Sequence, residues 1–160
     1  MKYFLIICSS LWVSGYTYGQ IKSVTVTGSW SASVTTTITE AGLNYTGNVT
    51  SASDQSLIDI SAQNNDPYTV TIQKQDTDWN SNVTVWARRT GVGTGGTAIS
   101  GGVDYIQLIA SAQFFFSGAI AQPADPRVVG IPIQYEIRGL SVLVPVKSYS
   151  TTIIYTVTSP

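Results

Sequence analysis

The stretch IPIQYEI, residues 131–137, decides the fold class because an apolar or aromatic side chain occupies every second position. These positions are Ile131, Ile133, Tyr135 and Ile137. Successive side chains of a β-strand point to opposite faces, so this spacing predicts a strand with one continuous buried face. The β-branched and aromatic residues found there also suit a pleated surface.

The same alternation recurs on both sides of this stretch. In PYTVTIQ, residues 67–73, it places Tyr68, Val70 and Ile72 on one face. Further strands are predicted at SVTVT (23–27), SVTTTI (33–38), NVTVWARR (82–89), YIQLIA (105–110), SVLVPV (141–146) and YSTTIIYTV (149–157). Gly, Pro, Asn and Asp cluster between these runs, as turns require, and no run of about ten residues has helical spacing.

This pattern predicts an all-β fold. Eight or nine short strands separated by turns at regular spacing are typical of a single antiparallel two-sheet sandwich. The strand count favours an immunoglobulin-like sandwich, although the Cys-Trp-Cys signature of antibody domains is absent. Because no internal repeat or long linker divides the chain, we expect one sandwich domain over residues 20–160.

Residues 1–19, MKYFLIICSSLWVSGYTYG, have the layout of a secretory signal peptide. Lys2 precedes an apolar core, and Thr17 and Gly19 provide small side chains before a cleavage point at Gln20. The apolar core of about 11 residues is too short for a membrane helix, which needs about 20. We therefore expect a secreted or cell-surface protein without a membrane span; the alternative is that this segment forms a buried N-terminal strand.

Composition limits the chemistry of the mature chain. Cys8 is removed with the signal peptide and the chain has no His, so Ser-His and Cys-His nucleophile pairs are excluded. Without Lys2 the charged residues are 7 Lys+Arg and 9 Asp+Glu, and so few cations argue against a nucleic-acid partner. A two-carboxylate glycosidase would need Glu136 with Asp59, Asp104 or Asp125. Glu136 beside Arg138 instead indicates a solvated surface pair, so we expect no enzymatic activity.

Gly91, Gly93 and Gly96 match the G-x-G-x-x-G spacing of a dinucleotide-binding turn. That fingerprint requires a helix directly after the glycines, and the residues that follow have no helical apolar stripe. The segment therefore predicts a long mobile loop between two strands and no cofactor site.

Four oxygen-bearing side chains alternate in DTDWNSN, at Asp76, Asp78, Asn80 and Asn82. This matches the first four ligand places of a calcium loop, so calcium is a candidate ligand. The motif lacks the turn glycine, which is replaced by Ser81, and the closing Glu. The favoured alternative is an Asx-rich turn whose side chains bond local amides.

Aromatic side chains and the C-terminal strand are the candidate contact surfaces. The candidates for stacking on a polysaccharide are Trp30, Trp79, Trp86, Phe114, Phe115 and Phe116, of which Trp79 and the phenylalanine triplet are favoured. The alternative for the tryptophans is core or sheet-edge packing. The terminal segment could pair with a neighbouring molecule through Ile153, Tyr155 and Val157, or it could close its own sandwich.

The segments YTVTIQKQDTDW, VTVWARRTGVGTGG, QFFFSG and GLSVLVPVKSYSTTIIYTV together cover most of the mature chain. In these segments the chain resembles a group of secreted, uncharacterised bacterial β-sandwich proteins. It is more loosely similar to surface-fibre and pilin-like subunits, which are small, Thr-rich and cysteine-poor. The resemblance implies a secreted structural or adhesive protein, with a carbohydrate-binding module as the alternative.

Overall fold

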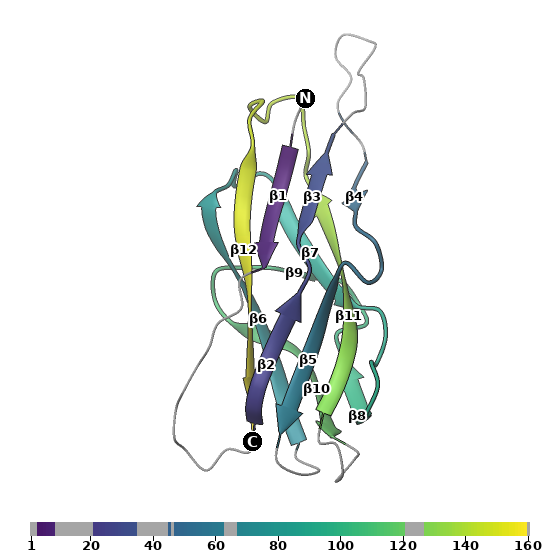
Figure 1. Cartoon of the computed structure of the whole chain (residues 1–160). Helices are drawn as coiled ribbons and strands as arrows, with labels where there is room; N and C mark the ends of the chain where they lie inside the picture. The colour runs from purple at the N-terminus through teal and green to yellow at the C-terminus, as the bar shows by residue number, and fades with distance from the viewer. Residues whose placement is uncertain are drawn as a thin grey trace.

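The computed structural model describes residues 3–8, 21–34, 45, 47–62, 67–120 and 127–159. These residues form twelve strands in two sheets and no helix, as Figure 1 shows. The described ranges accordingly include no helix long and apolar enough to cross a membrane. The predicted all-β class and the two-sheet arrangement are confirmed, whereas the predicted count of eight or nine strands is too low.

The first sheet, called sheet A, has six strands. Their order is β3 (Trp30–Ser33), β1 (Tyr3–Cys8), β12 (Tyr149–Thr158), β6 (Pro67–Asp78), β10 (Gln113–Ile120) and β8 (Gly96–Gly101). All neighbours are antiparallel except β1 and β12, which are parallel. β12 is therefore an internal strand, paired with β6 on one side and with β1 on the other.

The second sheet, called sheet B, is antiparallel throughout. Its order is β2 (Ile21–Thr27), β5 (Ser56–Ala62), β11 (Arg127–Arg138), β7 (Thr84–Arg89) and β9 (Ile106–Gln107). The short strand β4 (Val49–Thr50) pairs with β11 beyond the end of β5. β11 is thus the central strand of this sheet, as expected for the stretch with the longest apolar face.

The hydrophobic core lies between the two sheets. The alternating residues of 131–137 are all buried, and so are Tyr68, Val70 and Ile72 of β6, as predicted. The sheets meet through aromatic contacts: the ring of Trp30 on β3 stacks on Tyr135 of β11 with centroids 6.3 Å apart. The core therefore forms where sequence periodicity placed it.

A β-bulge in β10 changes the phenylalanine triplet. The register with β6 shifts between Phe114 and Phe116, so two consecutive rings, Phe115 and Phe116, point into the core. Phe114 is 56% exposed. Strict alternation would have buried every second ring, but a bulge places two successive residues opposite one.

Two of the predicted strands, 141–146 and 33–38, are not seen as strands over their full predicted length. SVLVPV, predicted as a strand, is a turn in which the amide of Val144 donates to the carbonyl of Ser141 at 3.0 Å. Pro145 lacks an amide donor for a sheet ladder, and Leu143 is 85% exposed, so the apolar pattern here is not a buried strand. The predicted strand at 33–38 lies mostly outside the described residues.

The glycine-rich segment is not simply a long mobile loop. Gly96 begins β8, which pairs with β10 at the edge of sheet A, and Thr94 forms an isolated bridge with Val129 of β11. Gly93 and Gly95 have positive φ, and an added Cβ would lie 2.7 Å and 2.2 Å from the carbonyl oxygens of Val129 and Arg127. These glycines let the chain approach β11 closely.

Candidate functional site

The most unusual feature of the fold is the origin of an internal strand. β1 lies between β3 and β12 in Figure 1, and its residues belong to the segment predicted to be a signal peptide. It pairs with β12 from Phe4–Tyr149 to Cys8–Ile153 and with β3 from Tyr3–Ser33 to Ile6–Trp30. Among the described residues, β3 pairs with no other strand. We call the position of β1 the β3/β12 slot.

Beyond the end of β1 the edge of β12 is open. In the described part of the chain, residues 154–158 pair only with β6. Tyr155 and Val157 are half-buried there, as are Val24 and Val26 of β2, which contacts β12 from sheet B. The β3/β12 slot therefore continues into the open edge of β12 at residues 154–158, which is bordered by the half-buried side chains named above.

The three C-terminal contact candidates all face the core. Ile153 is fully buried, and the half-buried Tyr155 and Val157 pack against the core from the same strand. Because β12 pairs with β6 over most of its length, the terminal strand is part of its own sandwich in this structure. Its other edge is the one that faces the slot.

The aromatic candidates do not form one surface. Trp79 is half-buried after the end of β6, where its indole donates to the carbonyl of Val83 at 2.6 Å and its ring meets Tyr149 edge-on. Phe114 pairs with Thr71, eight positions before Trp79 along the chain. Of the triplet, only Phe114 is exposed, so the structure brings no contiguous platform together at these four residues.

The calcium candidates are engaged with neighbouring side chains. Asp76 pairs with Lys74 and accepts from the hydroxyl of Thr151 at 2.8 Å, while Asp78 pairs with Lys147 at 2.6 Å. This bond to Asp78 raises the pKa of Lys147. No group of three or more acidic, His or Cys side chains suited to a metal lies within the described ranges.

The other two candidates lie in the turn after β6. The side-chain oxygen of Asn80 accepts from the backbone amide of Asn82 at 2.9 Å, which is the geometry of an Asx turn. Both asparagines are thus placed by a local hydrogen bond that requires no ion. Calcium binding stays a prediction.

A network of polar and aromatic side chains covers the outer face of sheet B. We call it the outer-face cluster, and its members are Trp86, Arg88, Tyr105, Gln134, Glu136 and Arg138. β7 and β11 build it, because Trp86 lies opposite Glu136, and Arg88 opposite Gln134, in the antiparallel register. Tyr105 lies directly before β9, the strand that pairs with β7, and its ring completes the cluster.

Arginine–aromatic contacts dominate this cluster. The guanidinium carbon of Arg138 lies 4.0 Å from the ring centre of Trp86 and 5.5 Å from that of Tyr105. The guanidinium carbon of Arg88 lies 4.7 Å from the same Tyr105 ring. Burial raises the pKa of Tyr105, and the charge of Arg88 opposes that change. Both cations therefore share one aromatic ring.

Glu136 is not the solvated residue that the sequence indicated. It is 8% exposed, and its carboxylate pairs with Arg138 and accepts from Asn48 at 3.0 Å and from Thr50 at 3.3 Å. β4 covers it from the side, because Thr50 pairs with Glu136 in the sheet. Of the acidic residues considered as its partners, Asp125 lies outside the described residues.

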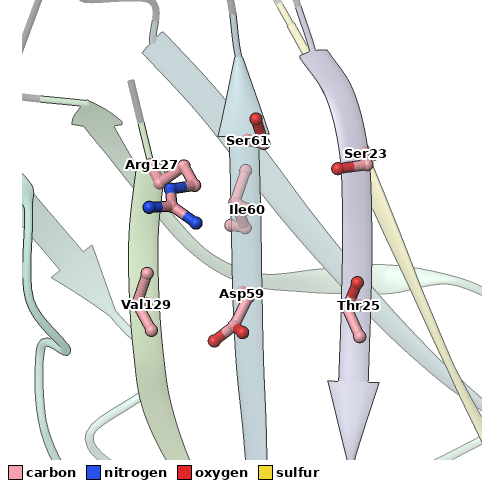
Figure 2. Close-up of a pocket in the computed structure, with 7 residues that line it drawn as sticks. All are labelled: Ser23, Thr25, Asp59, Ile60, Ser61, Arg127 and Val129. Carbon is pink, nitrogen blue, oxygen red and sulfur yellow. The ribbon is translucent and has the colours of Figure 1, made fainter. Parts of the chain in front are cut away.

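A polar hollow of about 210 Å³ lies elsewhere on the same face, over β2, β5 and β11. Figure 2 shows its lining residues, which are Ser23, Thr25, Asp59, Ile60, Ser61, Arg127 and Val129. The Asp59 carboxylate turns toward β11 and accepts from the backbone amide of Gly130 at 2.7 Å. Gly130 lies where the register of β11 with β5 shifts, so this bond gives a partner to an amide at the bulge. The hollow contains both a carboxylate and a guanidinium, so it has no preference for ligands of one charge.

No protein-family model matches the chain, and no curated protein or solved structure matches it.

The sequence did not predict the outer-face cluster as a group, although Trp86 was an aromatic candidate, and it offered an N-terminal strand only as the alternative to a signal peptide. The alternation of Trp86 and Arg88 on one strand, and of Glu136 and Arg138 on another, was visible and places each pair on one face. That these strands are neighbours depends on long-range pairing, which periodicity does not specify.

Proposed function

We propose that this chain is a secreted, non-enzymatic structural or adhesive surface protein whose copies assemble by strand exchange. The observation that carries the proposal is that β1, an internal strand of sheet A, comes from the segment predicted to be removed as a signal peptide. The precursor can thus complete its sheet with a strand that the mature protein lacks.

Removal of β1 would expose two sheet edges at once. Residues 149–153 of β12 would join the already open edge at 154–158, and β3 would lose the strand with which it pairs in the described structure. Such edges are templates for a strand from another molecule. Trp30 and Ala32, which are buried on β3, would also lose the strand that holds them over the core.

A second copy of this chain is the proposed source of the replacement strand. β2 is the better donor of the two terminal segments, because it pairs only with β5 in the described structure and begins at the predicted new terminus. β12 is the acceptor. Alternate side chains of an added strand can then fill the space beside Tyr155 and Val157. Because donor and acceptor are different surfaces, the contact is head-to-tail and produces fibres.

The strand order also supports an immunoglobulin-like assignment as part of this proposal. Such sandwiches have the order A-B-E-D in one sheet and place C, F and G in the other. β2-β5-β11-β7 follows the first order, and β6-β12 follows C and F, with β1 in the place of G. The strands β3, β4, β8, β9 and β10 are additional to this arrangement.

The alternative function, a carbohydrate-binding module at Trp79 and the phenylalanine triplet, has weaker support. Phe115 and Phe116 pack in the core, and Trp79 packs against Tyr149. A stacking surface needs exposed ring faces, which leaves Phe114 as the exposed member of the set.

Blocking signal cleavage tests the proposed function. Gly19→Leu removes the small residue that cleavage requires, so the strand of the leader should stay in the slot. We expect the unprocessed variant to be monomeric in light scattering, and the mature chain to form polymers. A mature chain that begins at Gln20 and stays monomeric at high concentration would overturn strand exchange.

A further inference from the structure

We infer that the outer-face cluster binds an acidic saccharide, with Arg88 as the residue that contacts the anionic group. The ligand class is a glycan that carries carboxylates or sulfate esters on its sugar rings. This inference concerns the outer face of sheet B and does not depend on strand exchange in sheet A.

The described hydrogen-bond partner of the Arg88 guanidinium is a neutral side chain. Its Nε donates to Gln134 at 2.9 Å, and no carboxylate of the described residues pairs with it. Lys74, Lys147 and Arg138 each pair with an acidic side chain. Arg89 also has no carboxylate partner among the described residues, but it is buried and its guanidinium donates to the carbonyl oxygens of Gly91 and Gly101. A half-buried cation without a counter-charge is unfavourable, and a bound anion would offset that cost.

Both arginines of the cluster contact aromatic rings. Both guanidinium groups lie against the ring of Tyr105, and that of Arg138 also lies over Trp86. Contact between a planar guanidinium and an aromatic ring leaves the N–H edge of the fork available in its plane. A carboxylate or sulfate can accept two such N–H groups at once.

Hydrogen bonds already fix the side chains of the site before a ligand binds. The side-chain oxygen of Gln134 accepts from Arg88 at 2.9 Å and from Tyr105 at 3.0 Å, and its amide donates to the carbonyl of Ser51 at 2.9 Å. β7 and β11 are each paired on both sides. Little side-chain freedom remains to be lost when a ligand binds.

The surrounding residues favour a sugar over a simple anion. Gln107 pairs with Trp86 across β7 and β9, and its side chain is exposed on the same face. Its amide can bond sugar hydroxyls, and the half-buried rings of Trp86 and Tyr105 offer apolar contact to ring C–H groups. The net charge of −2 for residues 20–160 repels polyanions generally, so retention of one would report a local site.

Affinity electrophoresis of the unprocessed Gly19→Leu protein, which we expect to be monomeric, in gels containing a polyuronate, a sulfated glycan or neutral dextran tests the inference. We expect retardation by at least one of the two anionic glycans and none by dextran. Arg88→Gln should weaken binding about tenfold or more, because the two-point contact is lost. Lys147→Gln, which removes one cation from an exposed pair with Asp78, is the matched control and should leave binding unchanged.

The pattern of retardation by the two anionic gels identifies the anion. Arg88→Lys keeps the charge without the fork and should bind less tightly than the parent protein, while circular dichroism melting checks that each variant is folded. The inference is overturned if neither anionic glycan retards the parent protein at low salt. It is also overturned if Arg88→Gln and Lys147→Gln reduce binding equally, since only net charge would then matter.

Discussion

The hydroxyl groups of Tyr135 on β11 and Tyr155 on β12 lie 2.8 Å apart and hydrogen-bond across the two sheets. Tyr135 also stacks on Trp30, which lies on the strand that β1 connects to β12. This pair therefore links the central strand of sheet B to the proposed acceptor strand of sheet A.

Removing either hydroxyl should destabilise the sandwich modestly. We expect Tyr135→Phe or Tyr155→Phe to lower the free energy of unfolding by about 1 kcal/mol, the usual net contribution of such a bond. The double variant should cost less than the sum, because one interaction is removed twice. Urea denaturation of the four proteins measures this coupling; strictly additive effects would show that the two hydroxyls do not act as a pair.

Tyr68 provides a pH-dependent test of the core. Its hydroxyl is buried and has no hydrogen-bond partner. Within the described ranges, no other buried side-chain nitrogen or oxygen lacks one. Burial raises its pKa from 10.0 to about 12, although the charge of Arg89 opposes the change. The folded state therefore holds this proton more tightly than the unfolded state.

Because the folded state resists loss of this proton, the titration of Tyr68 leaves the stability of the protein unchanged below pH 10 and lowers it as the pH rises from 10 toward 12. Tyr68→Phe should remove that alkaline loss and stabilise the protein by about 1 kcal/mol at neutral pH, because an unsatisfied buried hydroxyl is deleted. Thermal melting between pH 7 and alkaline pH compares the two proteins. Equal alkaline sensitivity of parent and variant would exclude Tyr68 as the source.

The phenylalanine triplet tests the bulge in β10. Phe115→Ala should destabilise the protein by about 3–5 kcal/mol, as for other buried aromatic residues. Phe114→Ala, which changes an exposed neighbour, should cost about 0.5 kcal/mol or less. Chemical denaturation gives both values. Phe116→Ala should cost as much as Phe115→Ala, because the bulge buries both rings. A cost at Phe116 as small as that at Phe114 would mean that the triplet follows simple alternation and that the bulge is absent.

Calcium binding by the turn after β6 is tested through stability. If Asp76, Asp78, Asn80 and Asn82 hold the ion, calcium should raise the melting temperature of the parent protein by mass action, and Asp76→Ala should abolish that rise. The contacts of Asp76 with Lys74 and Thr151 predict a small loss of stability in this variant without calcium as well. A parent protein that calcium does not stabilise leaves only the Asx turn.

Local periodicity predicted β2, β6, β7, β11 and β12 and the buried faces of β6 and β11, but it did not predict β5, β8 or β10. Tyr68 and Ile133 are buried where alternation placed them, because one face of each strand meets the opposite sheet. SVLVPV has the same apolar character but forms a turn at Ser141–Val144, followed by a proline. Apolar content alone did not separate these two outcomes.

Pairing between distant segments was the part that sequence could not supply. Arg88 and Gln134 are neighbours in the outer-face cluster because of the register of β7 with β11. The N-terminal segment has both the layout of a signal peptide and the β-branched and aromatic content of a strand. Only the sheet order places it beside β12 and suggests that one segment serves both roles in turn.

The central claim is that the β3/β12 slot accepts a strand from outside the mature chain. A peptide of residues 2–9 with Cys8→Ser should occupy the slot of the mature chain, raise its melting temperature and keep it monomeric. The same peptide with Ile6→Pro, which lacks one backbone donor, is the control and should do neither.

Light scattering of the mature chain, beginning at Gln20, with and without an excess of this peptide is the most direct measurement. The proposal predicts polymers without the peptide, monomers with it, and polymers again with the proline control. A mature chain that is a stable monomer without any peptide, and whose melting temperature the peptide does not change, would contradict it.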